Sequence, residues 1–163
     1  MLLFNIEVPD LLPGVDRVSV GDVNSLDDVF RAFGKITLIC NEWEKKYKEY
    51  ANLKELDVTD KSSLAHIHRK LEKIIDKKVY DSVMNVIDVR AHFEHEFLYS
   101  LFNYDKNSLR DGGTQIAYDY KNIKTVLDLC YNLFMEGIDY VSNLIDELDL
   151  SGNYHPHRPT IFD

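Results

Sequence analysis

The sequence has little of what several functional classes require. Only two of its 163 residues are cysteines, Cys40 and Cys130, so it carries no disulfide framework and favours a reducing compartment. No stretch approaches the roughly 20 apolar residues that cross a bilayer. The first residues also lack the basic region of a signal peptide. These absences predict a cytoplasmic protein with no membrane contact.

Positive charge is scarce as well. The chain has 19 Lys and Arg against 28 Asp and Glu, which gives a formal net charge of −9 at pH 7. Its short basic stretches, such as residues 45–48 and 77–78, are typical of solvated helix faces. A broad electrostatic grip on nucleic acid needs a basic face. The composition therefore argues against a non-specific nucleic-acid binder, but it leaves room for an enzyme that contacts RNA at one site.

Most sequence signatures of catalysis are missing too. The chain contains no G-x-G-x-x-G, no Walker loop, no C-x-x-C and no H-E-x-x-H. What it does contain is helical periodicity. From Leu26 onward, apolar residues recur at spacings of three and four and predict a first helix of about seven turns, with Ser25 as its cap. The stripe consists of Leu26, Val29, Phe30, Phe33, Ile36, Cys40, Trp43, Tyr47 and Tyr50.

Further periodic segments complete a helical layout. A second helix starts after Asp60 or Ser62, and its pattern leaves open whether it bends near residues 77–78 or gives way to a third helix. Residues 103–113 read as a loop, and a last helix follows and ends near Gly152. We expect an all-α, up-and-down bundle of four to five helices over residues 25–150. An extended or hairpin arm precedes it at 1–24, and a mobile tail follows at 151–163.

One segment, residues 88–96, gathers an arginine, two histidines and two glutamates in the central helical region. It allows three interpretations. The first is a polar helix face with stabilising pairs four residues apart. The second is a metal site in which His92, His95 and Glu96 converge, with His66 and His68 as further candidate ligands.

The third interpretation starts from Arg90 and His95, which are separated by four residues. In an all-helical chain of this length, the pair resembles the R-x4-6-H motif of HEPN-domain proteins. The layout over residues 25–150 is also similar, with a long first helix, a central motif and a long last helix. The chain departs from the family at Ala91, where a polar residue usually follows the arginine.

The resemblance implies a metal-independent endoribonuclease of the prokaryotic toxin or phage-defence type, working as a homodimer without a cofactor. In such a site His95 acts as acid or base and Arg90 clamps the phosphate, with His92 and Glu94 as supporting groups. Five residues along a helix turn through about 500°, which leaves Arg90 and His95 about 140° apart. Either the helix begins or kinks near Arg90, or a second copy completes the site.

A rival interpretation belongs to a different class. A small acidic helical domain is also what a non-enzymatic binding module looks like, such as an immunity or antitoxin-like protein that covers a basic protein partner, or a scaffold. Four tyrosines flank the motif and the glycine-rich loop and bear on the choice: Tyr99, Tyr104, Tyr118 and Tyr120. They could stack on bases, although we favour half-buried bundle aromatics.

Overall fold

The fold is an all-α bundle with a short hairpin arm, as the sequence predicts. The computed structural model describes residues 2–11, 17–110, 118–148 and 160–163, and for residues 102–110 it describes the backbone alone. The helices are α1 (Leu26–Leu53), α2 (Leu64–Arg69), α3 (Lys77–Arg110) and α4 (Tyr120–Leu148), and the strands are β1 (Leu2–Leu3) and β2 (Ile6–Glu7). None of the described helices combines the length and the apolar character needed to span a membrane.

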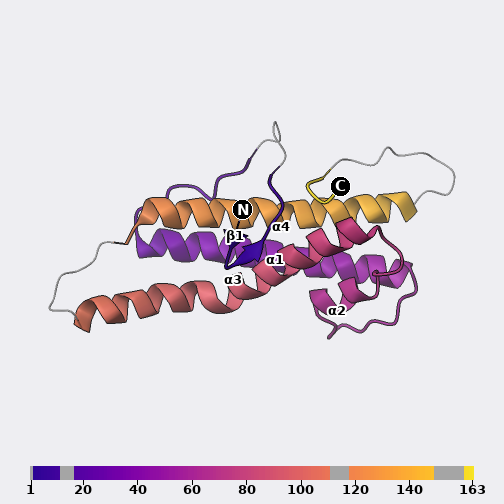
Figure 1. Ribbon diagram of the computed structural model, residues 1–163, viewed down its shortest axis with the longest axis horizontal. Coiled ribbons are helices and arrows are strands. Elements are labelled where there is room, and N and C mark those ends of the chain that lie inside the picture. Colours follow the sequence, from indigo (N-terminus) through magenta and orange to yellow (C-terminus); the bar gives the residue numbers. More distant parts are fainter. Residues whose placement is uncertain (1, 12–16, 111–117, 149–159) are drawn as a thin grey trace.

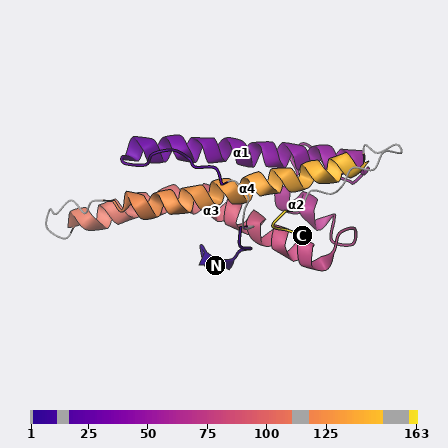
Figure 2. The same cartoon turned by 90° about the horizontal axis from the view of Figure 1, so that it is seen from above.

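The three long helices form the body of the molecule. α1 and α4 pack against each other along their lengths and run in the same direction, while α3 runs the opposite way (Figure 1). Seen from above, α3 and α4 overlap beside α1 over much of the bundle, and α2 sits at one end (Figure 2). The 88–96 segment lies in the middle of α3, where buried residues such as Phe93 alternate with exposed ones such as His95.

Side-chain caps explain where the helices begin. Ser25 accepts a hydrogen bond from the Asp28 amide at 3.2 Å, which confirms the predicted cap of α1. The cap of α2 is Ser63, whose hydroxyl accepts from the His66 amide, and not the predicted Asp60 or Ser62. Asp76 accepts from the Lys78 and Val79 amides at the start of α3. α2 and α3 are therefore two helices, because a capped start follows the turns after Lys70.

The second half of α3 corrects one prediction. Residues 103–110, expected to lie in a loop, continue the helix as far as Arg110. Residues 103–110 contain neither proline nor glycine, and the next glycine along the chain is Gly112. Nothing in this stretch therefore breaks the helix. The remaining loop residues, 111–113, lie outside the described part of the chain.

An aromatic core joins the three long helices. Trp43 on α1 stacks on Phe134 of α4, and Phe93 of α3 contacts the rings of Phe33 and Phe134. Trp43 is fully buried, as expected from its place on the apolar stripe. Cys40 and Cys130 are also buried, as free thiols. This core fixes the sides of α1 and α3 that face inward, and so the direction in which polar residues on those helices point.

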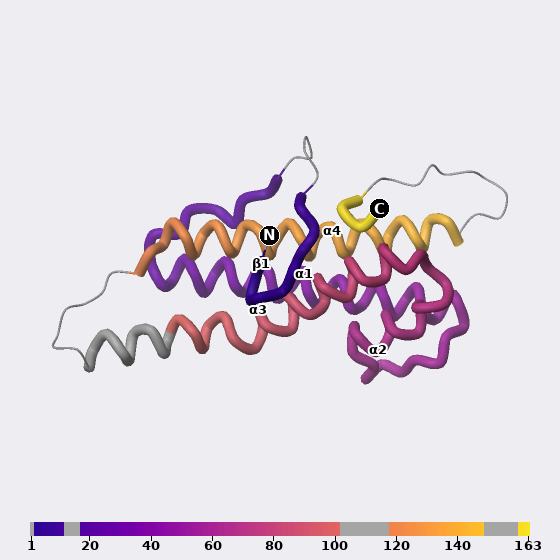
Figure 3. Tube along the Cα trace, viewed as in Figure 1, coloured from indigo at the N-terminus to yellow at the C-terminus, as the bar shows by residue number. Residues whose placement is uncertain are grey.

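Both ends of the chain pack onto the bundle. β1 and β2 pair as an antiparallel hairpin, and residues 17–24 then run along α4 to the start of α1 (Figure 3). The predicted mobile tail is only partly described, but residues 160–163 are folded against the bundle. Phe162 is 2% exposed and meets the Tyr140 ring edge-on at 5.5 Å. Phe162 thus packs the last four residues against the bundle, while residues 151–159 of the predicted tail lie outside the described part of the chain.

Candidate functional site

Arg90 lies on the inward side of α3, where it is tied to two carboxylates. Its side chain is 12% exposed, and its Nη2 donates to Glu44 Oε2 on α1 at 3.0 Å. Glu94, one turn further along α3, lies 3.7 Å from the same nitrogen. The Nε atom is buried and has no hydrogen-bond partner among the described residues. The guanidinium thus joins α3 to α1 with only part of its hydrogen-bonding capacity in use.

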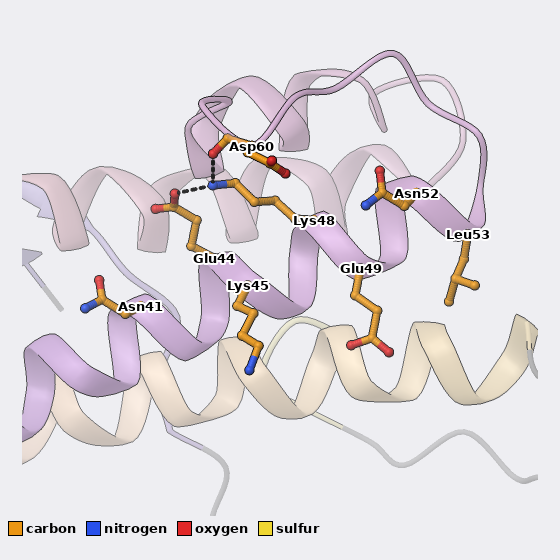
Figure 4. Close-up of a pocket in the computed structure, with 8 residues that line it drawn as sticks. All are labelled: Asn41, Glu44, Lys45, Lys48, Glu49, Asn52, Leu53 and Asp60. Carbon is orange, nitrogen blue, oxygen red and sulfur yellow. Dashed lines mark hydrogen bonds and ion pairs between the residues drawn. The ribbon is translucent and has the colours of Figure 1, made fainter.

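The contact of Arg90 continues across α1 as a chain of polar interactions. Glu44 also accepts a hydrogen bond from Lys48 at 3.0 Å, and Lys48 reaches the backbone carbonyl of Asp60 at 2.6 Å (Figure 4). Partial burial would raise the pKa of Glu44, but Lys48 and Arg90 outweigh it and hold that pKa below its usual value. Glu44 therefore stays ionised at physiological pH, and its negative charge compensates the positive charge of Arg90.

A groove of about 710 Å³ runs along the outer face of α1 beside this network. It is lined by Asn41, Glu44, Lys45, Lys48, Glu49, Asn52, Leu53 and Asp60 (Figure 4). Lys45 and Glu49 extend towards α4, away from the edge where Lys48 meets Asp60. Three acids and two lysines nearly cancel, so the groove offers no basic surface for a phosphate chain. His95 is not among its lining residues.

His95 lies on the outer side of α3. Its side chain is exposed and makes no hydrogen bond or ion pair with the described residues. His92, one turn earlier, approaches Glu96 through its Nδ1 at 3.1 Å. The Phe4 ring, from the tip of the N-terminal hairpin, stacks on His92 with ring centroids 6.2 Å apart. The imidazole of His95 is therefore free to act, while that of His92 is held by two neighbours.

The two residues of the proposed motif do not meet within one chain. α3 is helical without interruption from Lys77 to Arg110, so it does not begin at Arg90, although it changes direction along its length (Figure 1). Arg90 points towards α1 and His95 points outward. Neither a helix start nor a bend of α3 therefore brings the two side chains together within one chain.

No family model, curated protein or solved structure matches this chain. The assignment of its site therefore depends on the geometry of the side chains.

The geometry gives no support to the metal interpretation. Within the described residues, no three His, Cys, Asp or Glu side chains are placed to hold a metal ion together. His68, one of the candidate ligands, is buried between two tyrosines. Its Nδ1 lies 2.8 Å from the Tyr47 hydroxyl, and its Nε2 lies 2.8 Å from the Tyr80 carbonyl oxygen. Because a carbonyl can only accept, Nε2 carries the proton and both ring nitrogens are already used.

Sequence reasoning missed two features of the site. Glu44 and Lys48 form a charged pair four residues apart on α1, a signal visible in the sequence, but nothing there indicates that Arg90 is their partner. Phe4 is the second feature. Phe4 has a φ of 52° and Asn5 a φ of 61°, so both turn residues lie in the left-handed region. No pattern in the sequence predicted this conformation.

Proposed function

We propose that this chain is a HEPN-like, metal-independent endoribonuclease of the prokaryotic toxin or phage-defence type, active as an assembly of two copies. The observation that carries the proposal is the free, exposed imidazole of His95 in the same helix as the guanidinium of Arg90. An imidazole transfers protons readily near neutral pH, and a guanidinium stabilises negative charge on phosphate oxygens. RNA needs no other nucleophile than its own 2′-hydroxyl.

The chemistry assigns each group a step. His95 takes the proton of a 2′-hydroxyl, and the 2′-oxygen attacks the adjacent phosphorus. The bond from phosphorus to the 5′-oxygen breaks, and this leaving oxygen takes a proton from a second acid, for which the other copy's imidazole or water is suitable. Arg90 stabilises the charge on the non-bridging oxygens. The products are a 2′,3′-cyclic phosphate and a 5′-hydroxyl.

The test is cleavage of unstructured RNA by the purified full chain in the presence of a chelator, with product ends identified by mass spectrometry. We expect His95→Ala to abolish cleavage and Arg90→Lys, which keeps the charge opposite Glu44, to reduce it at least tenfold. His66→Ala is the matched control, because His66 is an exposed histidine on α2. RNA that stays intact with the unmodified protein, or cleavage that survives His95→Ala, rejects the proposal.

One observation favours a second candidate, a non-enzymatic acidic binding module. Arg90 is largely buried and paired with Glu44, which is how a structural arginine behaves in a helical bundle. In this alternative the net charge of −9 steers the chain towards a basic protein partner. The two candidates differ at His95: its substitution removes RNA cleavage in the first and changes no measured property in the second.

A further inference from the structure

The described residues around His95 offer little positive charge, so an RNA-cleaving function there would draw much of its affinity from uncharged contacts. With a net charge of −9, the chain lacks the electrostatic term that dominates most nucleic-acid binding. Along α3 from Asp88 to Ser100 the only basic side chain besides histidine is Arg90, which is turned inward. Aromatic rings are the other common source of affinity for single strands, because every base has a face that can stack.

Rings lie on both sides of His95 along α3: the half-buried His92, against which the half-buried Phe4 packs, and the exposed Tyr99. His92, with Phe4 stacked on it, precedes His95 by three residues, and Tyr99 follows it by four. On a regular helix His92 and Tyr99 project within about 20° of each other, and His95 lies about 40° to 60° to the side. Tyr99 is 66% exposed and not the half-buried bundle aromatic that the sequence favoured.

Phe4 is held in its place at a conformational cost. The hairpin turn Leu3–Ile6 has left-handed backbone at both central residues, a shape that Asn and Gly adopt readily and a bulky residue rarely does. Leu3 and Val8, which are buried, anchor the hairpin on the bundle and hold the strained tip over His92. Backbone strain of this kind persists mainly at functional positions.

We propose that the Phe4–His92 pair and Tyr99 are two stacking platforms for unpaired bases of single-stranded RNA on either side of a phosphate at His95. This inference rests on the proposed function and names its substrate as unpaired RNA. Neither Phe4 nor Tyr99 touches the reacting atoms; both are positioning residues. Since stacking supplies the affinity, binding depends only weakly on salt concentration and tolerates any base.

Binding by the full chain tests the proposal separately from catalysis. The probe is a short single-stranded RNA with 2′-O-methyl groups, which block cleavage, and with one 2-aminopurine, whose fluorescence falls when it stacks on a ring. We expect quenching on binding, and about five- to hundredfold weaker binding for Tyr99→Ala and Phe4→Leu. Phe4→Leu keeps the apolar bulk that packs the hairpin, whereas Phe4→Tyr keeps the ring and should bind as the unmodified chain does.

Two controls separate stacking from folding and from charge. Leu2→Ala alters an exposed residue of the same hairpin and should leave binding unchanged. An abasic oligonucleotide of equal length and charge should bind far more weakly than the probe. Equal binding of the abasic strand, or of Phe4→Leu and Tyr99→Ala, overturns the inference. A probe that does not bind the unmodified chain also overturns it, and if the same variants then shift the oligomeric state in sedimentation, the face is a protein interface.

The outcomes also separate this inference from the proposed function. Ring-dependent binding of the probe by a chain that leaves unmodified RNA intact keeps the stacking platforms and rejects the nuclease. If the chain cleaves unmodified RNA but Phe4→Leu and Tyr99→Ala bind the probe as tightly as the unmodified chain, the proposed nuclease function stands and the stacking platforms are rejected.

Discussion

Trp43 and Gly137 are in such close contact that a side chain at position 137 has no room. A Cβ atom added to Gly137 would lie 2.5 Å from Cε2 of the Trp43 ring and 2.8 Å from two further ring atoms. The indole is fully buried and stacks on Phe134, so it cannot swing aside freely. This contact sets how closely α1 and α4 approach each other.

Gly137→Ala should therefore destabilise the fold. Overpacking in a filled core costs about 1–3 kcal/mol, which outweighs the gain of up to about 1 kcal/mol from the better helix former. Gly34→Ala is the matched control, because nothing lies within 4 Å of a Cβ at that helical position and only the gain remains. Urea denaturation of both variants measures the free energies of unfolding. A Gly137→Ala chain as stable as Gly34→Ala would show that the two helices do not pack as described.

Local patterns were sufficient to predict the elements of the bundle. Ile36, Cys40, Trp43 and Tyr47 recur at helical spacing on α1, and all four are buried, because one face of a helix can be read from its own sequence. The hairpin arm and the cap at Ser25 also follow from neighbouring residues. These patterns could not predict which helix faces pack against each other. The close approach of α1 to α4 depends on Gly137, which lies nearly a hundred residues from Trp43.

The candidate site was harder to predict for the same reason. The two residues of the motif are only five positions apart in sequence, but the group that fixes Arg90 is Glu44, 46 positions away. Helical geometry alone correctly placed Arg90 and His95 on different sides of α3. It could not show that one side faces a carboxylate and the other is open, because that is decided by the packing of α3 against α1.

The Arg90–Glu44 pair should contribute measurably to stability. Glu44→Gln keeps the size of the side chain but removes the charge that faces Arg90 and Lys48, and for a partly buried pair we expect a loss of about 1–2 kcal/mol. Because the pKa of Glu44 is below its ordinary 4.5 in the fold, its stabilisation is present above that pH and is lost as the pH falls through the lower, folded value.

The control is Asp81→Asn, which breaks the Lys77–Asp81 pair on the outside of α3, where both side chains are more than half exposed. We expect no measurable change in its free energy of unfolding at pH 7. Equal effects from the two substitutions would mean that Arg90 is as solvated as Lys77, which would free it for a phosphate.

His68 should make the stability of the chain depend on pH. Burial lowers the pKa of His68 from 6.5 to about 4, although the Tyr80 carbonyl and Asp81 oppose the shift. The folded state thus holds a neutral imidazole, and its stability is fully present above pH 6.5 and falls as the pH drops towards 4. The difference corresponds to about 3 kcal/mol. Unfolding free energies between pH 7 and pH 4.5 measure it.

Two variants test whether His68 is the source of that slope. His68→Gln should lower the stability at pH 7, because it disturbs the contacts with Tyr47 and Tyr80, but it should flatten the dependence on pH. His66→Gln, an exposed neighbour, should leave both unchanged. A slope that persists in His68→Gln would place the titrating group elsewhere.

Hydrogen bonds from Asn132 and Asp128 hold residues 17–20 against α4. The Asn132 amide oxygen accepts from the Val18 amide at 2.9 Å, and its nitrogen donates to the carbonyls of Val18 and Asp128 at 2.8 and 2.7 Å. Asp128 in turn accepts from the Val20 amide at 2.8 Å through its side chain. The arm is thus bound mainly through its backbone.

Asn132→Asp should release this arm, because a carboxylate would face two carbonyl oxygens and stand close to Asp128. Loss of the donated bonds costs about 1–3 kcal/mol. Hydrogen exchange followed residue by residue should then show rapid exchange at the Val18 and Val20 amides, while the amides of α1 stay protected. Asn41→Asp adds the same charge at an exposed position on α1 and should change neither. Protection of Val18 in Asn132→Asp as in the unmodified chain would mean that the buried side chains Val20 and Val23, and not the amide, hold the arm in place.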